Sequence, residues 1–202
     1  MIQERVDGKK LYVFDLGGVT LDNVDFRPKW LEEIKVDKAE FYRTYNEYIW
    51  PIMDGTFTTK EFYKHLETYF SVKIEGEPFV EYFHPILNED VATTITRLRE
   101  EGNRVVAGTN NCVPHWKYIK EQGWDKLFDA SYPSQEMGLS KPFSSFYNYI
   151  LKKEGFEAQN AVMIDDSIEN IEGAKKVGMK AFHLTPTFNR KELYPSLKSI
   201  WN

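Results

Sequence analysis

Short apolar runs rich in β-branched and aromatic residues recur along the chain, and each leads into polar residues. Four strong runs and one weaker run lie at residues 11–14, 105–109, 161–164, 180–184 and 128–132. The segments between them carry apolar residues at helical spacing and lie at residues 88–102, 116–121, 143–154 and 167–177. Asn88 and Ser167 are typical N-cap residues for two of these helices. Strands that alternate with helices predict an α/β fold with a mostly parallel, doubly wound sheet.

The stretch from about residue 25 to residue 85 has a different pattern. It is rich in aromatic residues and contains no convincing strand. Pro28 is placed to open a helix that runs toward Tyr48. Thr58 followed by Glu61 matches a capping box at the start of another helix. We therefore expect a small helical module here.

Composition and charge narrow the classes of function. The chain has 202 residues, of which 42% are hydrophobic and 28% charged, as in an ordinary globular protein. The net charge is −5 and no long basic run occurs, so nucleic acid is not an expected partner. No apolar run approaches the roughly 20 residues that cross a bilayer, so no membrane partner is expected. The polar start of the chain and the single Cys112 favour a cytoplasmic location. The oligomeric state stays open.

Polar residues gather where the predicted strands end. Asp15 follows the first strand, Thr109 ends the second and is followed by Asn110, and Asp165 and Asp166 follow the fourth. In doubly wound sheets the ligand lies beyond the carboxyl ends of the strands. Phosphoryl transfer to a carboxylate needs a nucleophile, for which Asp15 is placed, and a hard cation such as Mg²⁺, for which carboxylate oxygens are ligands.

Further residues suit the phosphate itself. Lys141 offers a positive charge, while Thr109 and Asn110 offer a hydroxyl and an amide for its oxygens. The pair Gly17-Gly18 lets the chain turn sharply beside a ligand. Each feature alone is common in caps, turns and solvated surfaces, but the set in this order is far more specific.

The four motifs that carry these residues resemble those of the haloacid dehalogenase-like (HAD) hydrolase superfamily. They are Phe14-Asp15-Leu16-Gly17-Gly18-Val19, Gly108-Thr109-Asn110, Ser140-Lys141-Pro142 and the run from Ile164 to Ala174. The resemblance implies a Rossmann-like core with sheet order 5-4-1-2-3 and a helical cap inserted after the first strand. We expect the core at residues 1–22 and 87–202 and the cap at residues 23–86.

The resemblance also implies roles for the site residues. Asp15 would form an aspartyl-phosphate, and Mg²⁺ would be bound by Asp15, the main-chain carbonyl of Gly17 and Asp166, with Asp165 assisting or binding through water. Lys141 would assist catalysis, and Gly18 would join the residues that contact phosphate. The expected function is Mg²⁺-dependent hydrolysis of a small phosphorylated metabolite.

Gly17 departs from the pattern of most phosphatases in this superfamily, which carry a second aspartate there as general acid and base. A sugar released from its anomeric phosphate needs less acid help than an ordinary alcohol. A subgroup that includes glucose-1-phosphate phosphatases carries the same Asp-x-Gly pattern, so a sugar phosphate is the preferred substrate. Asp22 and Asp25 are candidates for a replacement acid or a substrate contact, although they also suit turns into the cap.

Two other functions stay open. The protein could bind a phosphorylated ligand and turn it over poorly, as a regulatory protein, or it could be a metal-independent dehalogenase, a class that also lacks the second aspartate. The acidic pair Asp165-Asp166 fits a cation site better than dehalogenation. Asp54, in a predicted cap loop, is a candidate substrate contact, and His115 is the one histidine close enough in sequence to the second strand end to test.

Overall fold

The computed structural model describes residues 9–201 and has a five-stranded parallel sheet at its centre. Its strand order is β5-β4-β1-β6-β7. The strand bounds are Leu11–Phe14 for β1, Arg104–Thr109 for β4, Ala130–Pro133 for β5, Ala161–Asp165 for β6 and Lys180–His183 for β7. Numbered along the chain within this sheet, the order is the predicted 5-4-1-2-3. The predicted α/β fold with a doubly wound parallel sheet is therefore confirmed.

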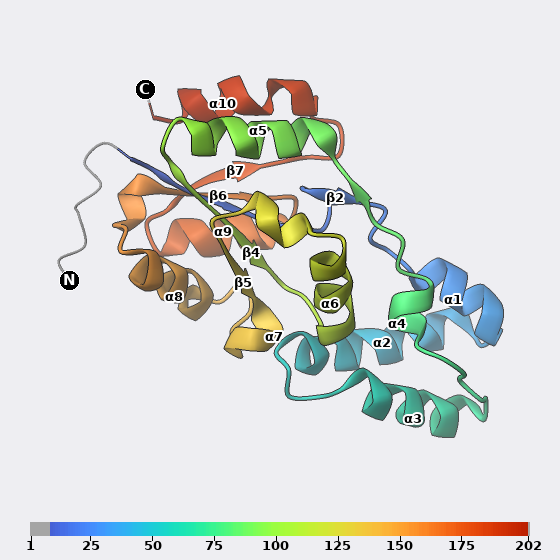
Figure 1. Ribbon diagram of the computed structural model, residues 1–202. Helices are drawn as coiled ribbons and strands as arrows, with labels where there is room; N and C mark the ends of the chain where they lie inside the picture. Colours follow the sequence, from blue (N-terminus) through green and yellow to red (C-terminus); the bar gives the residue numbers. More distant parts are fainter. Residues whose placement is uncertain (1–8, 202) are drawn as a thin grey trace.

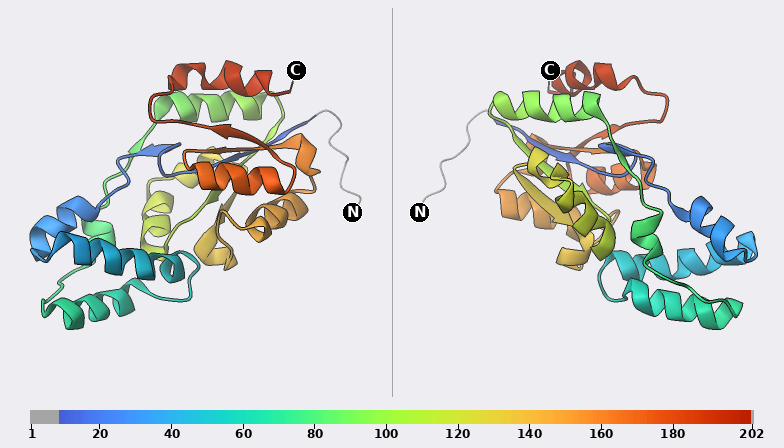
Figure 2. Two further views of the ribbon diagram at one scale, coloured as in Figure 1. Left: turned by 180° about the vertical axis from the view of Figure 1, so that it is seen from behind. Right: turned by 45° about the vertical axis from the view of Figure 1, so that its right-hand side comes forward.

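Helices cover both faces of the sheet, as Figures 1 and 2 show, with α5 and α10 on one face and α8 and α9 on the other. The bounds of the helices outside the cap are Glu89–Glu100 for α5, Val113–Glu121 for α6, Ser134–Met137 for α7, Ser144–Glu154 for α8, Ile168–Lys176 for α9 and Leu193–Ser199 for α10. Short 3-10 turns lie at Trp124–Leu127, Ala158–Asn160 and Arg190–Glu192.

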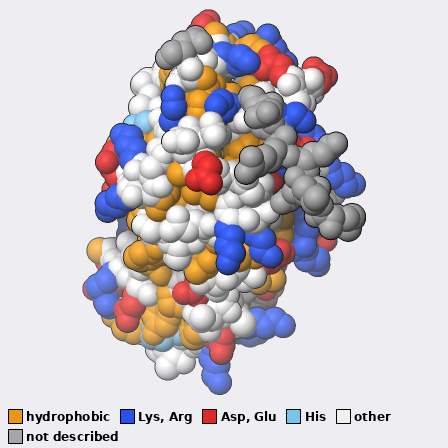
Figure 3. All heavy atoms as spheres, turned by 90° about the vertical axis from the view of Figure 1, so that its left-hand side faces the viewer, with side chains coloured by type: hydrophobic (Ala, Val, Ile, Leu, Met, Phe, Trp, Pro, Cys, Tyr) orange, Lys and Arg blue, Asp and Glu red, His pale blue; other side chains and the backbone are white. Residues whose placement is uncertain are grey.

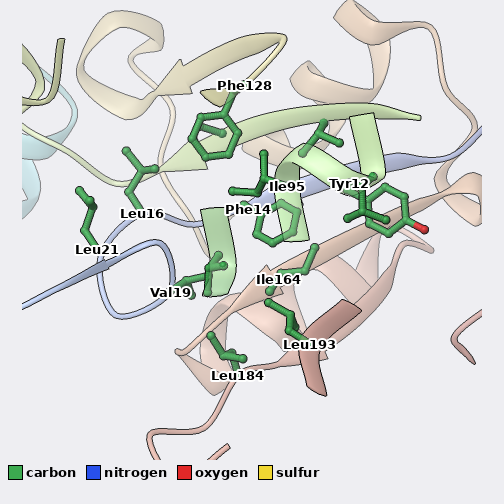
Figure 4. Packing of buried hydrophobic residues seen from close by; sticks show 14 of the residues in the cluster. Tyr12, Phe14, Leu16, Val19, Leu21, Ile95, Phe128, Ile164, Leu184 and Leu193 are labelled. Carbon is green, nitrogen blue, oxygen red and sulfur yellow. The ribbon is translucent and has the colours of Figure 1, made fainter. Parts of the chain in front are cut away.

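The central strand β1 is buried on both faces because its residues alternate between two cores. Tyr12 and Phe14 pack with α5, α6 and α10, and Leu11 and Val13 pack with α8 and α9. Figure 4 shows Phe14 beside Ile164 of the neighbouring strand in the first core. Two packed faces hold the end of β1 in a fixed position, and that end carries Asp15.

Four helices between residues 27 and 81 form a separate layer beside one end of the sheet (Figure 1). Their bounds are Arg27–Ile34 for α1, Lys38–Met53 for α2, Thr59–Phe70 for α3 and Pro78–Glu81 for α4. They share an aromatic core in which Trp30, Phe41, Phe62 and Phe79 are all 0–1% exposed. Below we call these four helices the cap; the exact cap bounds, residues 23–86, remain a prediction.

The cap is connected to the sheet through a short antiparallel pair. Strand β2 (Leu21–Asp22) pairs with β3 (Ile86–Leu87), so the chain leaves and re-enters the core side by side. Strands of two residues give no periodic signal, and the sequence pattern did not predict this pair.

Two predicted elements differ in the structure. The helix expected from Pro28 toward Tyr48 is two helices, because Lys35 adopts a left-handed conformation at φ 52° and ends α1. Asp37 then caps α2 by accepting a hydrogen bond from the Glu40 amide. The strand expected from residue 128 begins at Ala130, since Phe128 follows a 3-10 turn and packs into the core.

No helix within residues 9–201 is both long and apolar enough to span a bilayer. On the face shown in Figure 3, basic and acidic side chains are interspersed among its described atoms, with no continuous basic patch.

Candidate active site

Three aspartates meet at the carboxyl end of the sheet. Asp15 follows β1, Asp165 ends β6 and Asp166 follows it, and one carboxylate oxygen of each lies within 4.8 Å of the others. The parallel pairing of β1 with β6 produces this meeting, because it places Phe14 opposite Ile164, the residue before Asp165. The structure therefore brings Asp15 together with the Asp165-Asp166 pair, which lies far from it in the sequence.

The turn after β1 is fixed by backbone and hydroxyl contacts. The Asp15 amide donates to the carbonyl of Ile164 at 2.9 Å, and the Thr20 hydroxyl donates to the carbonyl of Asp15 at 2.8 Å. Gly18 has φ +73°, and a Cβ there would lie 2.2 Å from Oδ2 of Asp166. Only glycine at position 18 leaves room for the Asp166 carboxylate beside this turn.

Lys141 lies behind the acidic group and is completely buried. Its ammonium is 2.9 Å from Oδ1 of Asp15 and 2.7 Å from Oδ2 of Asp165. The side chain of Asn110 holds the Lys141 backbone from both sides, accepting from its amide at 2.8 Å and donating to its carbonyl at 2.9 Å. Asn110 thus positions Lys141; a phosphate contact from the same amide stays a prediction.

Asp165 and Asp166 have different surroundings. Asp165 is fully buried, and its Oδ1 accepts from the Ser167 amide and from Nδ2 of Asn170, both at 2.9 Å. With Oδ2 held by Lys141, both of its oxygens have protein partners. Asp166 is exposed and, within the described part of the chain, its carboxylate makes no hydrogen bond to another residue. The Asp166 carboxylate is therefore the more available of the two for a cation.

Asp15 also presents one engaged and one free oxygen. Its Oδ1 accepts from the Leu16 amide at 2.7 Å and contacts Lys141, whereas Oδ2 has no hydrogen-bond partner among residues 9–201. An oxygen without a partner, next to one that is held in place, is suited to attack an electrophile.

Burial and like charge dominate the electrostatics. Burial raises the pKa of Asp15 to about 7, against the attraction of Lys141 and with a further contribution from the negative charge of Asp165. Although the residue is exposed overall, partial burial of the Asp166 carboxyl and the negative charge of Asp165 likewise raise the pKa of Asp166. Burial alone would lower the pKa of Lys141, but Asp15 and Asp165 outweigh it and raise that pKa. Three carboxylates face one ammonium, so a further positive charge would be stabilising here.

The donor set fits a hard divalent cation. All three candidate side-chain ligands are carboxylates, the type of ligand that Mg²⁺ prefers, and their oxygens are close enough to share one ion. Gly17 lies at the same turn, on the wall of the adjoining cleft.

A cleft of about 500 Å³ separates these strand ends from the cap. Its core wall includes Gly17, Thr109, Asn110 and Asp166, and its other wall comes from α1, α2 and α4 and the segments beside them. Thr109, at the end of β4, is 1% exposed. A ligand phosphate at the acidic group would therefore place its organic part against the cap.

A family model decides the relationship of the chain to known proteins. The model of haloacid dehalogenase-like hydrolases matches residues 9–178. The chain is a haloacid dehalogenase-like hydrolase. The resemblance seen in the four motifs is confirmed, and so is the expectation of an enzyme of a hydrolase family.

Individual relatives of this HAD-like hydrolase are distant. A sesquiterpene phosphatase, AstK, from Aspergillus oryzae is 27% identical over 184 residues, which cover 87% of this chain and 90% of the relative. A glyceraldehyde 3-phosphate phosphatase from Methanocaldococcus jannaschii is 27% identical over 161 residues, covering 78% and 67% of the two chains. The crystal structure of a HAD-family enzyme from Bacteroides thetaiotaomicron, in complex with magnesium and inorganic phosphate, has a TM-score of 0.75 at 22% identity, covering 93% of this chain and 100% of that one.

The other acidic residues singled out in the sequence lie outside the acidic group. Asp22 accepts from Asn88 at 2.8 Å and from Arg190 at 3.2 Å, at the β2–β3 pair that joins the cap of the HAD-like hydrolase to its core. Asp25 is paired with Arg27, and although burial raises the pKa of Asp25, the hydrogen bonds and charge of Arg27 lower it overall. An acid must hold a proton near neutral pH, so this environment disfavours Asp25 as the replacement.

Of the two remaining candidates, His115 lines the cleft and Asp54 does not. Oδ1 of Asp54 accepts from the amide and the hydroxyl of Thr56, and Asp54 is absent from the lining of the cleft. His115 does line the cleft, where its ring stacks on Phe83 with centroids 3.7 Å apart. Burial lowers the pKa of His115 to about 3, which keeps the ring neutral.

Two supporting residues were missed by sequence reasoning. Thr20 holds the carbonyl of Asp15, and Arg190 donates to the carbonyl of Gly18 at 3.0 Å and to Asp22. Thr20 belongs to no quoted motif, and Arg190 lies 172 residues from Gly18, so neither gave a local signal. Only the folded chain brings Arg190 to Gly18 and Asp22, beside the β2–β3 pair.

Proposed function

We propose that this HAD-like hydrolase is a Mg²⁺-dependent phosphomonoester hydrolase that acts through an aspartyl-phosphate on Asp15. The observation that carries the proposal is the meeting of Asp15, Asp165 and Asp166 within 4.8 Å, with the buried ammonium of Lys141 beside them. The family assignment and the phosphatase names of the two curated relatives support it.

The cation would be held by Asp15, Asp166 and the main-chain carbonyl of Gly17, with Asp165 behind them. Asp165 is assigned the outer position because Lys141, Ser167 and Asn170 already engage its oxygens. When bound, Mg²⁺ holds the nucleophile and the phosphate together despite their like charge and neutralises phosphate oxygens. The magnesium and phosphate present in the Bacteroides structure support this choice of ion.

The chain's own residues supply the rest of the chemistry. Oδ2 of Asp15 attacks phosphorus, the bond from phosphorus to the ester oxygen breaks, and the alcohol leaves after taking a proton from water. Water then attacks the aspartyl-phosphate, releasing inorganic phosphate and a proton and restoring the Asp15 carboxylate. Lys141 neutralises charge on the transferred group, and Thr109 and Asn110 are assigned to its oxygens. The structure disfavours the phosphate contact expected from Gly18, because the Gly18 amide already donates to the carbonyl of Leu21 at 2.9 Å; Gly18 instead leaves room for Asp166.

Gly17 limits the choice of leaving group. General acid–base catalysis is typically worth about 10²–10⁴-fold, and no acidic side chain stands at this position. On the leaving group alone, a sugar phosphate that releases its anomeric hydroxyl is the candidate that this limit favours. The relatives' names do not decide it, since they include a sesquiterpene phosphatase and a glyceraldehyde 3-phosphate phosphatase. A cytoplasmic location stays a proposal.

The test uses p-nitrophenyl phosphate, whose leaving group needs little protonation. We expect turnover that requires Mg²⁺, stops when EDTA is added, returns with excess Mg²⁺, and is lost in Asp15→Asn. Acid quench during turnover should trap phosphate on Asp15, detected as an 80-Da adduct by mass spectrometry, a mass that reflects one added phosphoryl group.

Two outcomes would reject the proposal in favour of the alternatives. Tight binding of phosphorylated ligands with no turnover of any ester would indicate a regulatory protein. Release of halide from a haloacid in the presence of EDTA would indicate a dehalogenase. Binding alone would not require the nucleophile Asp15, and a metal-independent dehalogenase would not require the cation site that Asp165 and Asp166 suit.

A further inference from the structure

We infer that the natural substrate is a phosphomonoester of a hydrocarbon-like alcohol, whose apolar chain lies against the cap. This inference rests on the proposed function and narrows its substrate. It departs from the sugar phosphate expected from the sequence, because the two ends of the cleft differ in polarity. The core end carries Gly17, Thr109, Asn110 and Asp166. The cap end is lined mainly by apolar side chains, with a few polar ones among them; the apolar residues are Phe26, Ile49, Trp50, Met53, Phe79 and Phe83, and the polar ones are Asp25, Arg27, Tyr45, Asn46 and His115.

The charged groups at the cap end already have partners. Arg27 donates from Nε to Oδ1 of Asp25 at 2.6 Å and from its terminal nitrogen to Oδ2 at 3.0 Å. The Arg27 guanidinium also lies over the Tyr45 ring, 5.1 Å from its centroid. A two-point ion pair with both carboxylate oxygens engaged offers little to an incoming sugar hydroxyl.

The uncharged polar groups of the cap end are few: the Asn46 amide, the Tyr45 hydroxyl and His115, which adds one hydrogen-bonding nitrogen at most. Its Nε2 is buried and has no hydrogen-bond partner among the described residues, and its ring packs between Phe26 and Phe83. A sugar carries several hydroxyls, and each one buried without a partner is unfavourable. A hydrocarbon chain makes no such demand on this wall.

Trp50 supplies an independent observation. It lies on α2, lines the cleft and is 46% exposed, which is a large apolar surface in contact with water. Tyr69, on α3, is 47% exposed but lies outside this cleft, and its hydroxyl is satisfied by Glu40 and Arg43. A bound hydrocarbon chain would cover Trp50, and burial of apolar area on both partners favours binding.

The experiment compares esters that release similar alcohols. Ethyl, butyl and octyl phosphate all release primary alkanols, so their chemistry without the acid at Gly17 is alike and only the chain differs. Full burial gives roughly fourfold per methylene, and we expect kcat/KM to rise at least about 100-fold from ethyl to octyl phosphate, given partial burial. Glucose 6-phosphate, which also releases a primary alcohol, should be the poorer substrate.

Variants locate the effect. Trp50→Ser should reduce the octyl-to-ethyl ratio at least about fivefold, and Tyr69→Ser, with an equally exposed aromatic on the same cap, should leave the ratio within about twofold. Titration calorimetry with octyl and ethyl phosphate on the Asp15→Asn protein, in Mg²⁺ high enough to offset the loss of one proposed ligand, measures binding to the cleft without turnover and should show the same order of affinity.

The outcomes separate this inference from the function on which it rests. Turnover of p-nitrophenyl phosphate with a flat chain-length series, or with glucose 6-phosphate preferred, overturns the hydrocarbon substrate alone. Absence of turnover with every ester, p-nitrophenyl phosphate included, overturns the proposed function and this inference with it. A rising series that Trp50→Ser does not weaken overturns the assignment of the chain to this wall.

Discussion

The ammonium of Lys141 lies 2.7 Å from Oδ2 of Asp165, and neither side chain is exposed to solvent. The same ammonium contacts Asp15, so one buried cation serves two carboxylates. Removing one partner of a buried ion pair leaves an uncompensated charge, which is far costlier than the loss of a surface pair. The acidic group therefore depends on Lys141 for stability as well as for chemistry.

Lys141→Met should destabilise the protein by about 3–5 kcal/mol at pH 7.5, because Asp15 and Asp165 lose their counter-charge. Lowering the pH should recover part of the loss, since protonation removes the uncompensated charge. Lys175→Met is the control. Lys175 pairs with Glu172 at 2.8 Å, but both side chains are about half exposed, so this substitution should destabilise the protein by less than about 1 kcal/mol. Urea unfolding of both variants at pH 7.5 and 5.5 checks this; equal losses would contradict it.

Gly17→Asp should keep the fold and raise the rate on alkyl phosphates. A Cβ at Gly17 would meet only Val24, at 3.5 Å, and its φ is outside the left-handed region. An aspartate there would supply the missing general acid, an effect of typically about 10²–10⁴-fold, so we expect at least a tenfold rise in kcat on butyl phosphate. The rate on p-nitrophenyl phosphate should change far less, because that leaving group needs little protonation.

Gly18→Ala is the matched change one residue later, and the opposite result is expected. It forces a side chain into φ +73° and within 2.2 Å of the Asp166 carboxylate. The strain should cost about 1–3 kcal/mol, and displacement of Asp166 should weaken the response to Mg²⁺.

If Gly17→Asp changes the rates on butyl phosphate and p-nitrophenyl phosphate equally, a general-acid role at position 17 is excluded.

The sequence revealed the parts of the site that lie at the ends of buried strands. Asp15, Thr109, Asp165 and Asp166 could be found because an apolar run followed by a polar residue is a local signal, and parallel pairing then fixes where those ends meet. The Gly17 departure was equally visible, since it lies inside a motif.

The rest depends on contacts between distant segments. Arg190 reaches Gly18 only in the folded chain, and the pair of β2 with β3 joins residues more than 60 positions apart. The expected single helix is divided into α1 and α2 because Lys35 adopts a left-handed conformation. Lysine has no intrinsic preference for that conformation, so nothing in the sequence indicated the break. The apolar wall that includes Trp50 likewise depends on how the cap packs over the core. The expectation of a sugar phosphate was made from the sequence and could not take this wall into account.

Asp15→Asn should stabilise the metal-free protein at pH 7.5. Burial raises the pKa of Asp15 to about 7, above its ordinary value of 3.8. The folded state therefore holds a proton that the unfolded state releases, and ionisation of Asp15 removes stability as the pH rises from about 4 to 7. An asparagine has no such loss, so its Tm without Mg²⁺ should be higher by roughly 2–4 °C per kcal/mol gained.

Mg²⁺ should reverse this order of thermal stability, so that the wild type has a higher Tm than Asp15→Asn. At a concentration 100 times its Kd, a ligand stabilises the folded state by about 2.7 kcal/mol, and the wild type should gain most of this because Asp15 is a proposed ligand. The Asp15→Asn protein should gain clearly less. Thermal unfolding with EDTA and with Mg²⁺, at pH 7.5 and 4.5, measures both effects; an equal gain in the two proteins would remove Asp15 from the cation site.

His115 should make the stability of the protein fall at acidic pH without affecting the pH dependence of catalysis. Burial lowers the pKa of His115 to about 3, from an ordinary value of 6.5. Between these values the unfolded state binds a proton that the folded state does not, so stability falls as the pH falls, by about 1.4 kcal/mol per pH unit. His115→Phe, which keeps an aromatic ring against Phe83, should lose about 2–3 kcal/mol less than the wild type between pH 6.5 and 4.5. His84→Phe, at an exposed position, should retain the wild-type dependence of stability on pH.

Because His115 stays neutral near neutral pH, the pH profile of kcat should be the same in His115→Phe and wild type. Loss of an inflection near neutral pH in His115→Phe would instead indicate that His115 takes part in proton transfer.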